Sequence, residues 1–288
     1  MKEITGHTVL TGLLGSPVAH SISPMMHNEA FRQLDLDYVY LAFDVPRKQL
    51  KVAVDGMKAL GVRGFNLTMP HKTEMAGLCD RLSPAAALVG AVNTVVNDGG
   101  VLTGHTTDGV GYMRAAKDAG FDLAGKTMTL LGAGGAATAI MVQAALDGMK
   151  EIRVFNRKSP TYDRAQALIE KINAATHCHV TLHDLNDNDD LGESILTSQI
   201  LTNSTNVGMA PDTDGCLIDD TAILHPDLIV SDIIYNPEET RLMKLARMKG
   251  CPTFNGLYML LYQGAEAFRI WTGMDMPIPV IKEKYFSR

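Results

Sequence analysis

The sequence predicts an α/β protein built from two domains, and three observations support this. The chain has 288 residues, more than one hydrophobic core usually organises, since cores tend to split between ~100 and ~250 residues. Strand-like apolar runs alternate with helix-like runs along the chain, which is typical of a largely parallel sheet. A glycine-rich turn at residues 132–137 then joins a strand directly to a helix, as in a Rossmann-type unit.

The composition narrows the class of protein. Hydrophobic residues at 46% and charged residues at 20% are ordinary for a globular protein that buries a sizeable core. The net charge of -6 disfavours a nucleic-acid partner, which would need clustered Lys and Arg. No run approaches the ~18 apolar residues of a bilayer span, and the N-terminus does not read as a signal peptide. We therefore expect no membrane partner and a cytoplasmic location.

The first predicted domain contains strands, helices and a terminal strand pair. Strands are expected over 9–15, 38–45, 64–69, 91–98 and 101–108, and helices over 23–34, over 49–61 and from about residue 72. The final segment, 254–277, has helical spacing of apolar residues. We predict a domain of residues 1–108, completed by helices of about 256–288 that return to it.

The second predicted domain, residues 109–255, is a βαβ series. After a helix at 109–120, strands are expected near 128–131, 151–155, 179–185, 200–205 and 228–234, with helices after the glycine turn and at 164–175. The polar segment 186–194 favours either a surface loop or a weak helix. The order of elements predicts a dinucleotide-binding domain.

The glycine turn has a physical reason to bind a pyrophosphate. Gly132, Gly134 and Ala137 fit the pattern G-x-G-x-x-A. The first position allows a tight turn, the second lets the anion approach the backbone, and the third packs helix against strand. The alternative is a tight turn that binds nothing. At the end of the next strand, Asn156, Arg157 and Lys158 stand where NAD-binding proteins carry an acidic residue.

Two cations at that position favour the 2′-phosphate of NADP, although exposed basic residues are also common there. Asp163, slightly further on, could still serve the ribose of NAD.

A Lys and an Asp could supply the chemistry at a carbonyl that accepts hydride. Oxygen gains negative charge in such a reaction, so a proton donor or a cation is needed nearby. Lys72 and Asp108 are the candidates. An unperturbed Lys has a pKa of ~10.4, so Lys72 could orient the substrate and stabilise charge as much as transfer a proton. Taken alone, Lys72 would be read as a surface residue.

The chain resembles the shikimate dehydrogenase family, including its quinate-accepting branch, along nearly its whole length. The motifs that carry this resemblance are "SPVAHSISPMMHN" (16–28), "NLTMPHK" (66–72), "GAVNTV" (90–95), "TDG" (107–109), "GAGGAA" (132–137), "NRK" (156–158) and "YQGAEAF" (262–268). They occur in the family's order.

The resemblance implies a role for each motif residue. Lys72 and Asp108 would be the catalytic pair. The substrate would be bound by Ser21 and Ser23 at its carboxylate and by Thr68, Asn93 and Gln263 at its ring, with Tyr235 also near the carboxylate. The cofactor would lie against Gly132, Ala133, Gly134, Gly135, Ala136, Asn156, Arg157, Lys158, Asn206, Tyr235 and Gly256.

Other readings stay open for some of these residues. Ser21 and Ser23 could simply cap the following helix. His71 is expected to point away from the site, and His20, His27 and His105 are expected to be structural, since no set of metal ligands accompanies them. The four cysteines lack zinc-ligand spacing, so we expect reduced thiols and no metal.

The implied activity is the reversible NAD(P)-dependent reduction of 3-dehydroshikimate to shikimate, a step of aromatic amino acid biosynthesis. Ser159 stands where the NAD-using branch carries Asp, while the segments 150–158 and 268–273 look like that branch, so NADP and NAD both remain open. Whether quinate is also a substrate and whether the chain forms a homodimer are open too. The alternatives are a folate-linked methylene dehydrogenase and a sensor that binds both ligands without turnover.

Overall fold

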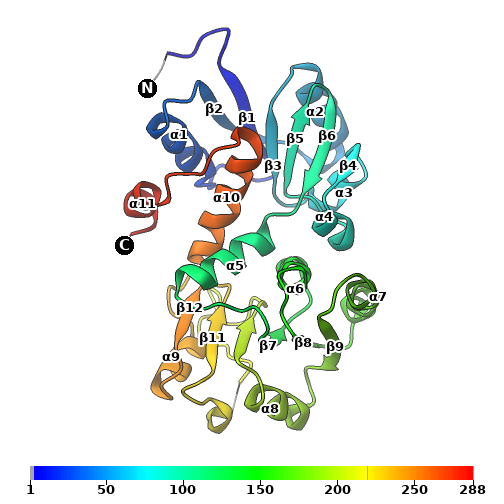
Figure 1. The fold of residues 1–288 in the computed structure, drawn as a ribbon, viewed down its shortest axis with the longest axis vertical. Coiled ribbons are helices and arrows are strands. Elements are labelled where there is room, and N and C mark those ends of the chain that lie inside the picture. The colour runs from blue at the N-terminus through cyan, green and yellow to red at the C-terminus, as the bar shows by residue number, and fades with distance from the viewer. Residues whose placement is uncertain (1–2, 219, 288) are drawn as a thin grey trace. The chain divides into compact units, whose positions relative to one another are not determined.

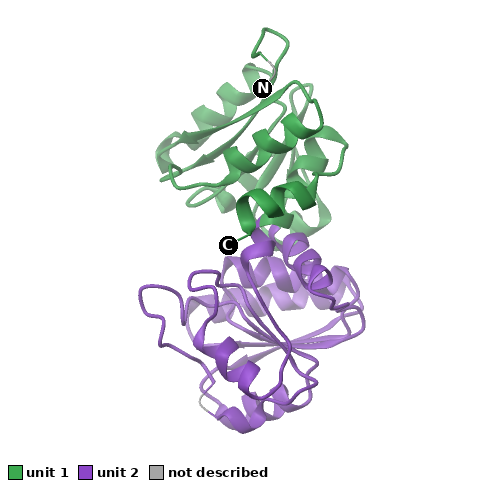
Figure 2. Ribbon diagram, turned by 90° about the vertical axis from the view of Figure 1, so that its left-hand side faces the viewer, with its two compact units in different colours: residues 1–107, 261–288 green, residues 108–260 purple. Residues whose placement is uncertain are grey.

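The computed structural model describes residues 3–218 and 220–287. The chain divides into two compact units (Figure 2). One runs to Thr107 and includes the segment from Leu261 onward, and the other is Asp108–Leu260. Each unit holds one six-stranded sheet. The C-terminal helices therefore return to the first unit, as the sequence predicts.

The sheet of the first unit is mixed, although a largely parallel one was expected. Its order is β2-β1-β3-β5-β6-β4. The strands are β1 (Val9–Gly15), β2 (Tyr38–Asp44), β3 (Gly64–Leu67), β4 (Arg81–Leu82), β5 (Thr94–Asp98) and β6 (Val101–His105). Strand β5 runs antiparallel to β3 and β6, while the other pairs are parallel. Gly99 and Gly100 have φ of 61° and 94°, the backbone that a two-residue hairpin turn requires, and so reverse the chain between β5 and β6.

Helices cover both faces of this sheet (Figure 1). They are α1 (Ser23–Gln33), α2 (Leu50–Ala59), α3 (Lys72–Ala76), α4 (Pro84–Val89), most of α10 (Leu257–Thr272), α11 (Ile278–Ile281), the short η1 (Arg47–Gln49) and the π-helical η3 (Lys282–Phe286). The apolar side of α2, with Leu50, Val54 and Met57, joins Phe65 and Val95 in one core.

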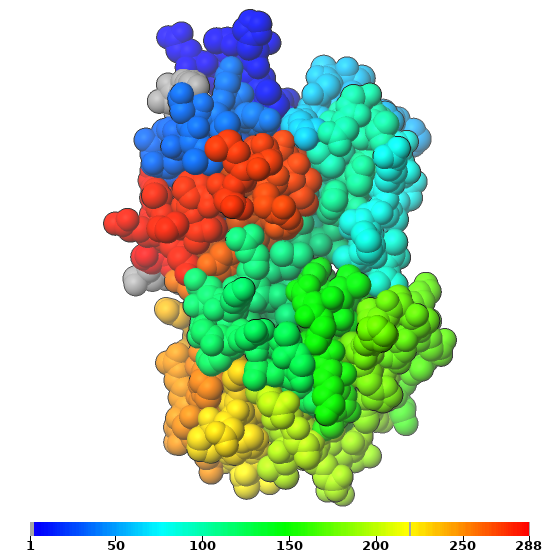
Figure 3. All heavy atoms as spheres, in the orientation of Figure 1, coloured from blue at the N-terminus to red at the C-terminus, as the bar shows by residue number. Residues whose placement is uncertain are grey.

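An aromatic cluster forms the core on the other face. His27 and Phe31 of α1 pack with Tyr40 of β2 and with Phe268 and Trp271 of α10. The Trp271 indole N–H donates to the carbonyl of Val95 at 2.9 Å. It can approach because β3 begins with Gly64, where a Cβ would lie 2.2 Å from Nε1 of Trp271. The C-terminal segment lies beside the N-terminal one (Figure 3), and Lys284 pairs with Glu29 of α1 at 2.8 Å.

A side chain occupies the outer edge of the sheet at β2. Asn28 of α1 donates through Nδ2 to the carbonyl of Tyr40, and its Oδ1 accepts from the N–H of the same residue, both at 2.8 Å. Strand β2 is the terminal strand of the sheet, so these two backbone groups have a partner that is not another strand.

The second unit has an entirely parallel sheet in the order β12-β11-β10-β7-β8-β9. The strands are β7 (Thr127–Leu131), β8 (Glu151–Asn156), β9 (His179–Asp184), β10 (Ile200–Asn203), β11 (Ile229–Asp232) and β12 (Thr253–Asn255). Chain order reverses between β7 and β10, which is the point where open α/β sheets bind ligands at their carboxyl ends. The sequence reading did not predict β12, which has three residues.

The helices of this unit are α5 (Asp108–Asp118), α6 (Gly135–Leu146), α7 (Pro160–Ala175), α8 (Asn188–Leu196) and α9 (Arg241–Met248), with the short η2 (Thr221–Ile223). Helix α8 settles the choice left open for segment 186–194. Its N-cap, Asp187, accepts the N–H of Asp190 at 3.1 Å, and its apolar side joins the core through Leu191 and Ile195.

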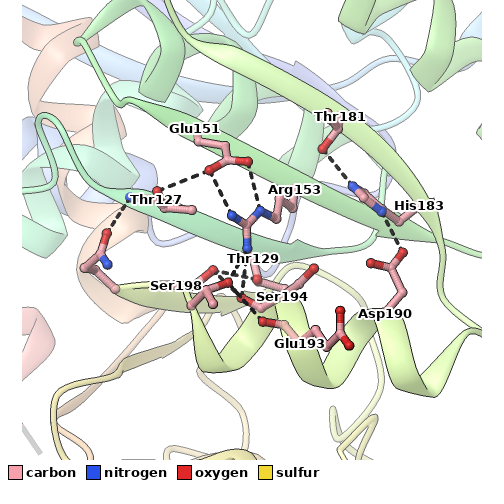
Figure 4. A network of polar contacts seen from close by, with 12 residues as sticks. Thr127, Thr129, Glu151, Arg153, Thr181, His183, Asp190, Glu193, Ser194 and Ser198 are labelled. Atoms are coloured by element: carbon pink, nitrogen blue, oxygen red, sulfur yellow. Dashed lines mark hydrogen bonds and ion pairs between the residues drawn. The ribbon is translucent and has the colours of Figure 1, made fainter.

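Polar contacts tie α8 to the sheet (Figure 4). Arg153 of β8 pairs with both carboxylate oxygens of Glu151 at 2.9 and 3.0 Å and donates to the carbonyl of Ser194 in α8. Nδ1 of His183 in β9 forms a hydrogen bond of 2.7 Å with Oδ2 of Asp190 in α8. These contacts hold the edge of the sheet at β8 and β9. Among the described helices, none combines the length and apolar character needed to cross a membrane.

Candidate active site

The turn between β7 and α6 has the geometry that a pyrophosphate needs. Gly132 has φ of 98°, and a Cβ there would lie 2.8 Å from Cγ2 of Thr205, so only glycine fits without strain. Gly134 and Gly135 are exposed, with open space where a Cβ would be. Ala137 is fully buried beneath the helix. The first N–H groups of a 12-residue helix thus face an open position, which suits a phosphate.

The end of β8 carries the basic residues predicted from the sequence. Asn156 pairs in register with Asp184 of β9, and Arg157 is exposed. Lys158 lies 3.4 Å from the Asp184 carboxylate, whose pKa is lowered by the backbone N–H of Asn186 and by Lys158. One cation is thus shared with a carboxylate, and the other is presented to solvent.

The remaining predicted cofactor residues follow strands of the same sheet. Asn206 comes after β10 and is exposed, and Tyr235 comes after β11 with 43% of its surface exposed. Gly256 follows β12, where a Cβ would lie 1.8 Å from the carbonyl oxygen of Ile233. The carboxyl ends of parallel strands meet at one edge, so these residues and the glycine turn share that edge.

In the first unit, the segment after β3 holds two predicted substrate residues. Thr68 donates its backbone N–H to Leu14 at 3.0 Å and accepts the N–H of His71 at 3.0 Å. Lys72 is the first residue of α3, half-buried, and its carbonyl accepts from Val92 at 2.8 Å. His71 is fully buried, and its Nε2 donates to the carbonyl of Val45 at 2.8 Å. Its ring therefore supports the backbone of a neighbouring segment.

The two serines lie in the turn before α1. The hydroxyl of Ser21 accepts the N–H of Ser23 at 3.2 Å, while the N-cap position itself is Ile22 and offers no side-chain bond. Neither serine therefore occupies the N-cap position, since Ser21 lies before it and Ser23 is the first residue of the helix. This turn adjoins the segment after β3, because Ser16 donates to the carbonyl of Met69 at 3.0 Å.

Asn93 precedes β5, and hydrogen bonds fix its side chain. Its Oδ1 accepts the backbone N–H of Thr107 at 2.8 Å, and its Nδ2 donates to the Thr107 hydroxyl at 3.0 Å. Its carbonyl accepts from Leu67 at 2.8 Å, which places Asn93 beside the end of β3. Asp108 directly follows Thr107 and is the first residue of α5.

Gln263 is half-buried on α10. The next residue, Gly264, packs against Met26, whose Cε would lie 2.2 Å from a Cβ at that position. The unit thus assembles the segments that carry Ser21, Ser23, Thr68, Lys72, Asn93 and Gln263.

The histidines near these motifs have structural surroundings. His27 is enclosed by the aromatic cluster, and burial lowers its pKa from 6.5 to about 3. Burial also lowers the pKa of His105, with Glu266 acting in the opposite sense. Within residues 3–218 and 220–287, no group of three or more His, Cys, Asp or Glu side chains could hold a metal ion.

Family models match three stretches of the chain. Residues 13–95 match the shikimate dehydrogenase substrate binding domain, residues 114–214 match the shikimate / quinate 5-dehydrogenase model, and residues 256–284 match the shikimate 5'-dehydrogenase C-terminal domain. The chain belongs to the shikimate dehydrogenase family. The architecture expected from the sequence, a substrate-binding unit and a Rossmann-type unit, is that of its members.

Similar proteins match over nearly their full length. The shikimate dehydrogenase (NADP(+)) of Listeria innocua is 56% identical over 285 residues, which are 99% of this chain and 98% of that one. A quinate/shikimate dehydrogenase of Escherichia coli is 46% identical, covering 98% of each. The structure of shikimate 5-dehydrogenase from Listeria monocytogenes, in complex with shikimate and NAD, superimposes with a TM-score of 0.95, at 56% identity and 98% coverage of both chains.

Proposed function

We propose that this protein catalyses the reversible reduction of 3-dehydroshikimate to shikimate with NAD(P)H. One observation carries the proposal: a relative that is 56% identical over nearly the whole chain holds shikimate and NAD in its structure. The reaction belongs to aromatic amino acid biosynthesis.

Lys72 and Asp108 are the proposed catalytic pair. In the oxidation direction the bound cofactor would take up the hydride, and Lys72 and Asp108 would receive the proton of the substrate hydroxyl. Ser21 and Ser23 would bind the carboxylate through neutral donors, which act well where their geometry is fixed. Thr68, Asn93 and Gln263 would bind the ring hydroxyls, and Tyr235 would lie near the carboxylate.

NADP is the proposed preferred cofactor. The cofactor would supply the hydride and would lie on the edge formed by Gly132, Ala133, Gly134, Gly135, Ala136, Asn206 and Gly256. Exposed Arg157 would meet the 2′-phosphate, with Asn156 and Lys158 beside it. The name of the 56% identical Listeria innocua relative supports this preference. NAD would also bind, more weakly.

The remaining parts of the proposal concern organisation. The substrate domain would be residues 1–108 with about 256–288, and the dinucleotide domain 109–255.

All four cysteines are thiols, which suits a reducing, cytoplasmic location. A homodimer is proposed as well, and light scattering on the purified protein would decide it.

Initial rates would test the function. Shikimate and quinate would each be oxidised with NAD and with NADP, alongside a Lys72→Ala variant and a Lys51→Ala control, whose lysine pairs with Asp55 on the exposed side of α2. We expect turnover of shikimate, a bias toward NADP, and loss of rate only in Lys72→Ala. No turnover with any pairing would overturn the proposal, and tight binding of both ligands without turnover would favour a sensor.

A further inference from the structure

A buried chain of hydrogen bonds in the first unit leads from Tyr40 to the predicted substrate residue Asn93. The Tyr40 hydroxyl donates to Oδ1 of Asn66 at 2.8 Å. The Nδ2 of Asn66 donates to the carbonyl of Asn93 at 3.1 Å and to the hydroxyl of Thr94 at 2.9 Å. The Thr94 hydroxyl in turn donates to Oδ1 of Asn93 at 3.1 Å. Each of these side chains is at most 6% exposed.

Two backbone groups fix the direction of every bond in this chain. The N–H of Thr107 can only donate, so Oδ1 of Asn93 must face it. The carbonyl of Asn93 can only accept, so Asn66 must turn Nδ2 toward it. Oδ1 of Asn66 then faces Tyr40, whose single hydroxyl proton must be the donor. The hydrogen bonds therefore determine which side-chain atom of Asn66 and of Asn93, oxygen or nitrogen, faces each partner.

Tyr40 itself is held from three directions. Asn28 binds both its backbone N–H and its carbonyl at 2.8 Å. His27 stacks on its ring, with centroids 4.5 Å apart and planes inclined by 12°, and Trp271 packs against it at 5.9 Å. Tyr40 is thus fixed in place and is linked to one predicted substrate residue, Asn93, through Asn66.

We propose that Tyr40 is a positioning residue of the substrate site, which supports Asn93 through Asn66 and Thr94 in the orientation that Thr107 sets. This inference rests on the proposed function, in which Asn93 binds the substrate ring. Without the hydroxyl, Oδ1 of Asn66 would be buried and unpaired, which is costly. The Asn66 side chain would shift, and its hydrogen bond to the Thr94 hydroxyl, which bonds Asn93, would weaken. Substrate recognition would weaken while the cofactor unit stays intact.

Tyr40→Phe tests this, with Tyr112→Phe as the matched control. Tyr112 is also a buried tyrosine, and its hydroxyl lies 2.6 Å from that of Thr202, but it belongs to the second unit. We expect kcat/KM for shikimate to fall between about fivefold and a hundredfold in Tyr40→Phe, on the scale of an unpaired buried acceptor. The KM for the cofactor should change by less than about twofold. Tyr112→Phe should keep kcat/KM for shikimate within about twofold at a similar loss of thermal stability.

Thr94→Val is the second variant, since it removes the middle of the chain while keeping the shape of the side chain. It should show the same split, a lower kcat/KM for shikimate with an unchanged KM for the cofactor. Equal effects of Tyr40→Phe and Tyr112→Phe on shikimate, or an unaffected Thr94→Val, would overturn the inference and leave the proposed function standing. A wild-type protein that neither turns over nor binds shikimate would overturn both.

Discussion

Acidification should destabilise the first unit through His27. This histidine is neutral in the folded protein, because burial lowers its pKa from 6.5 to about 3. Between these two values the unfolded chain binds one proton that the folded chain does not, so the free energy of unfolding falls as the pH falls. The slope approaches about 1.4 kcal/mol per pH unit below the unfolded pKa, and the loss reaches roughly 2 kcal/mol between pH ~6.5 and ~4.5.

That window separates His27 from Glu29, although burial raises the pKa of Asp147 and that of Asp232 above the usual value of an aspartate. Glu29 has its pKa lowered from 4.5 to about 2 by hydrogen bonds from Arg32, Gln33 and Lys284. Its contribution to the free energy of unfolding is therefore fully present above pH ~4.5 and is lost only as the pH falls from there toward ~2. His105 acts in the same direction as His27, so the contribution of His27 has to be isolated by substitution.

The only tryptophan provides the assay. Trp271 lies 5.2 Å from His27, so its fluorescence during urea unfolding reports on this unit. His27→Phe keeps an aromatic ring beside Tyr40 and cannot titrate, and its slope between pH ~6.5 and ~4.5 should be lower by about one proton. His177→Phe, at an exposed position, should keep the wild-type slope. Equal slopes in wild type and His27→Phe would refute the reasoning.

Three further substitutions have expected outcomes. Gly132→Ala should cost about 1–2 kcal/mol because of its positive φ, measured by thermal unfolding, and should weaken cofactor binding in calorimetry. Gly134→Ala, where a Cβ has space, should weaken cofactor binding with little loss of stability; a large loss would contradict this. Gly64→Ala should destabilise the first unit by roughly 3 kcal/mol or more, because its Cβ would overlap Trp271, and unchanged fluorescence-detected unfolding would disprove it. Arg157→Ala should lower kcat/KM at least about tenfold for NADP but little for NAD; equal losses would remove its proposed role.

The second unit was the more predictable from sequence. Its strands are parallel, and β7, β10 and β11 are buried along their whole length, so they read as short apolar runs. The turn at Gly132 and Gly134 has a pattern set by backbone geometry. Strand β12 escaped because three residues carry no periodicity. In the first unit, β1 was predicted with its observed bounds, but the antiparallel arrangement of β5 was not. The signal was present in Gly99 and Gly100, two glycines between strand-like runs.

The candidate site was predictable only through its motifs. Asn66 and His71 stand in the same motif as Lys72, yet nothing in their spacing tells which side chains support the structure. His71 bonds the carbonyl of Val45, and Asn66 bonds Tyr40 of a distant strand. Tyr40 was missed because a tyrosine in an apolar run reads as core. Only its hydroxyl, which needs a hydrogen-bond partner when it is buried, could have indicated that Tyr40 belongs to a polar network.

The amide of Asn28 has a consequence for the protein outside its reaction. Strand β2, with the sequence YVYLAFD, is an apolar strand at the end of a sheet, and Leu41 within it is 46% exposed. The unpaired backbone groups of such an edge strand can bond a strand of another chain, and this pairing can start aggregation. The amide of Asn28 bonds the N–H and the carbonyl of Tyr40 as a neighbouring strand would. The ladder therefore ends at Tyr40 without leaving these two backbone groups unpaired. Asn28 therefore blocks the edge of this sheet against a further strand. An Asn28→Ala variant should aggregate more than the wild type when it is expressed at high concentration.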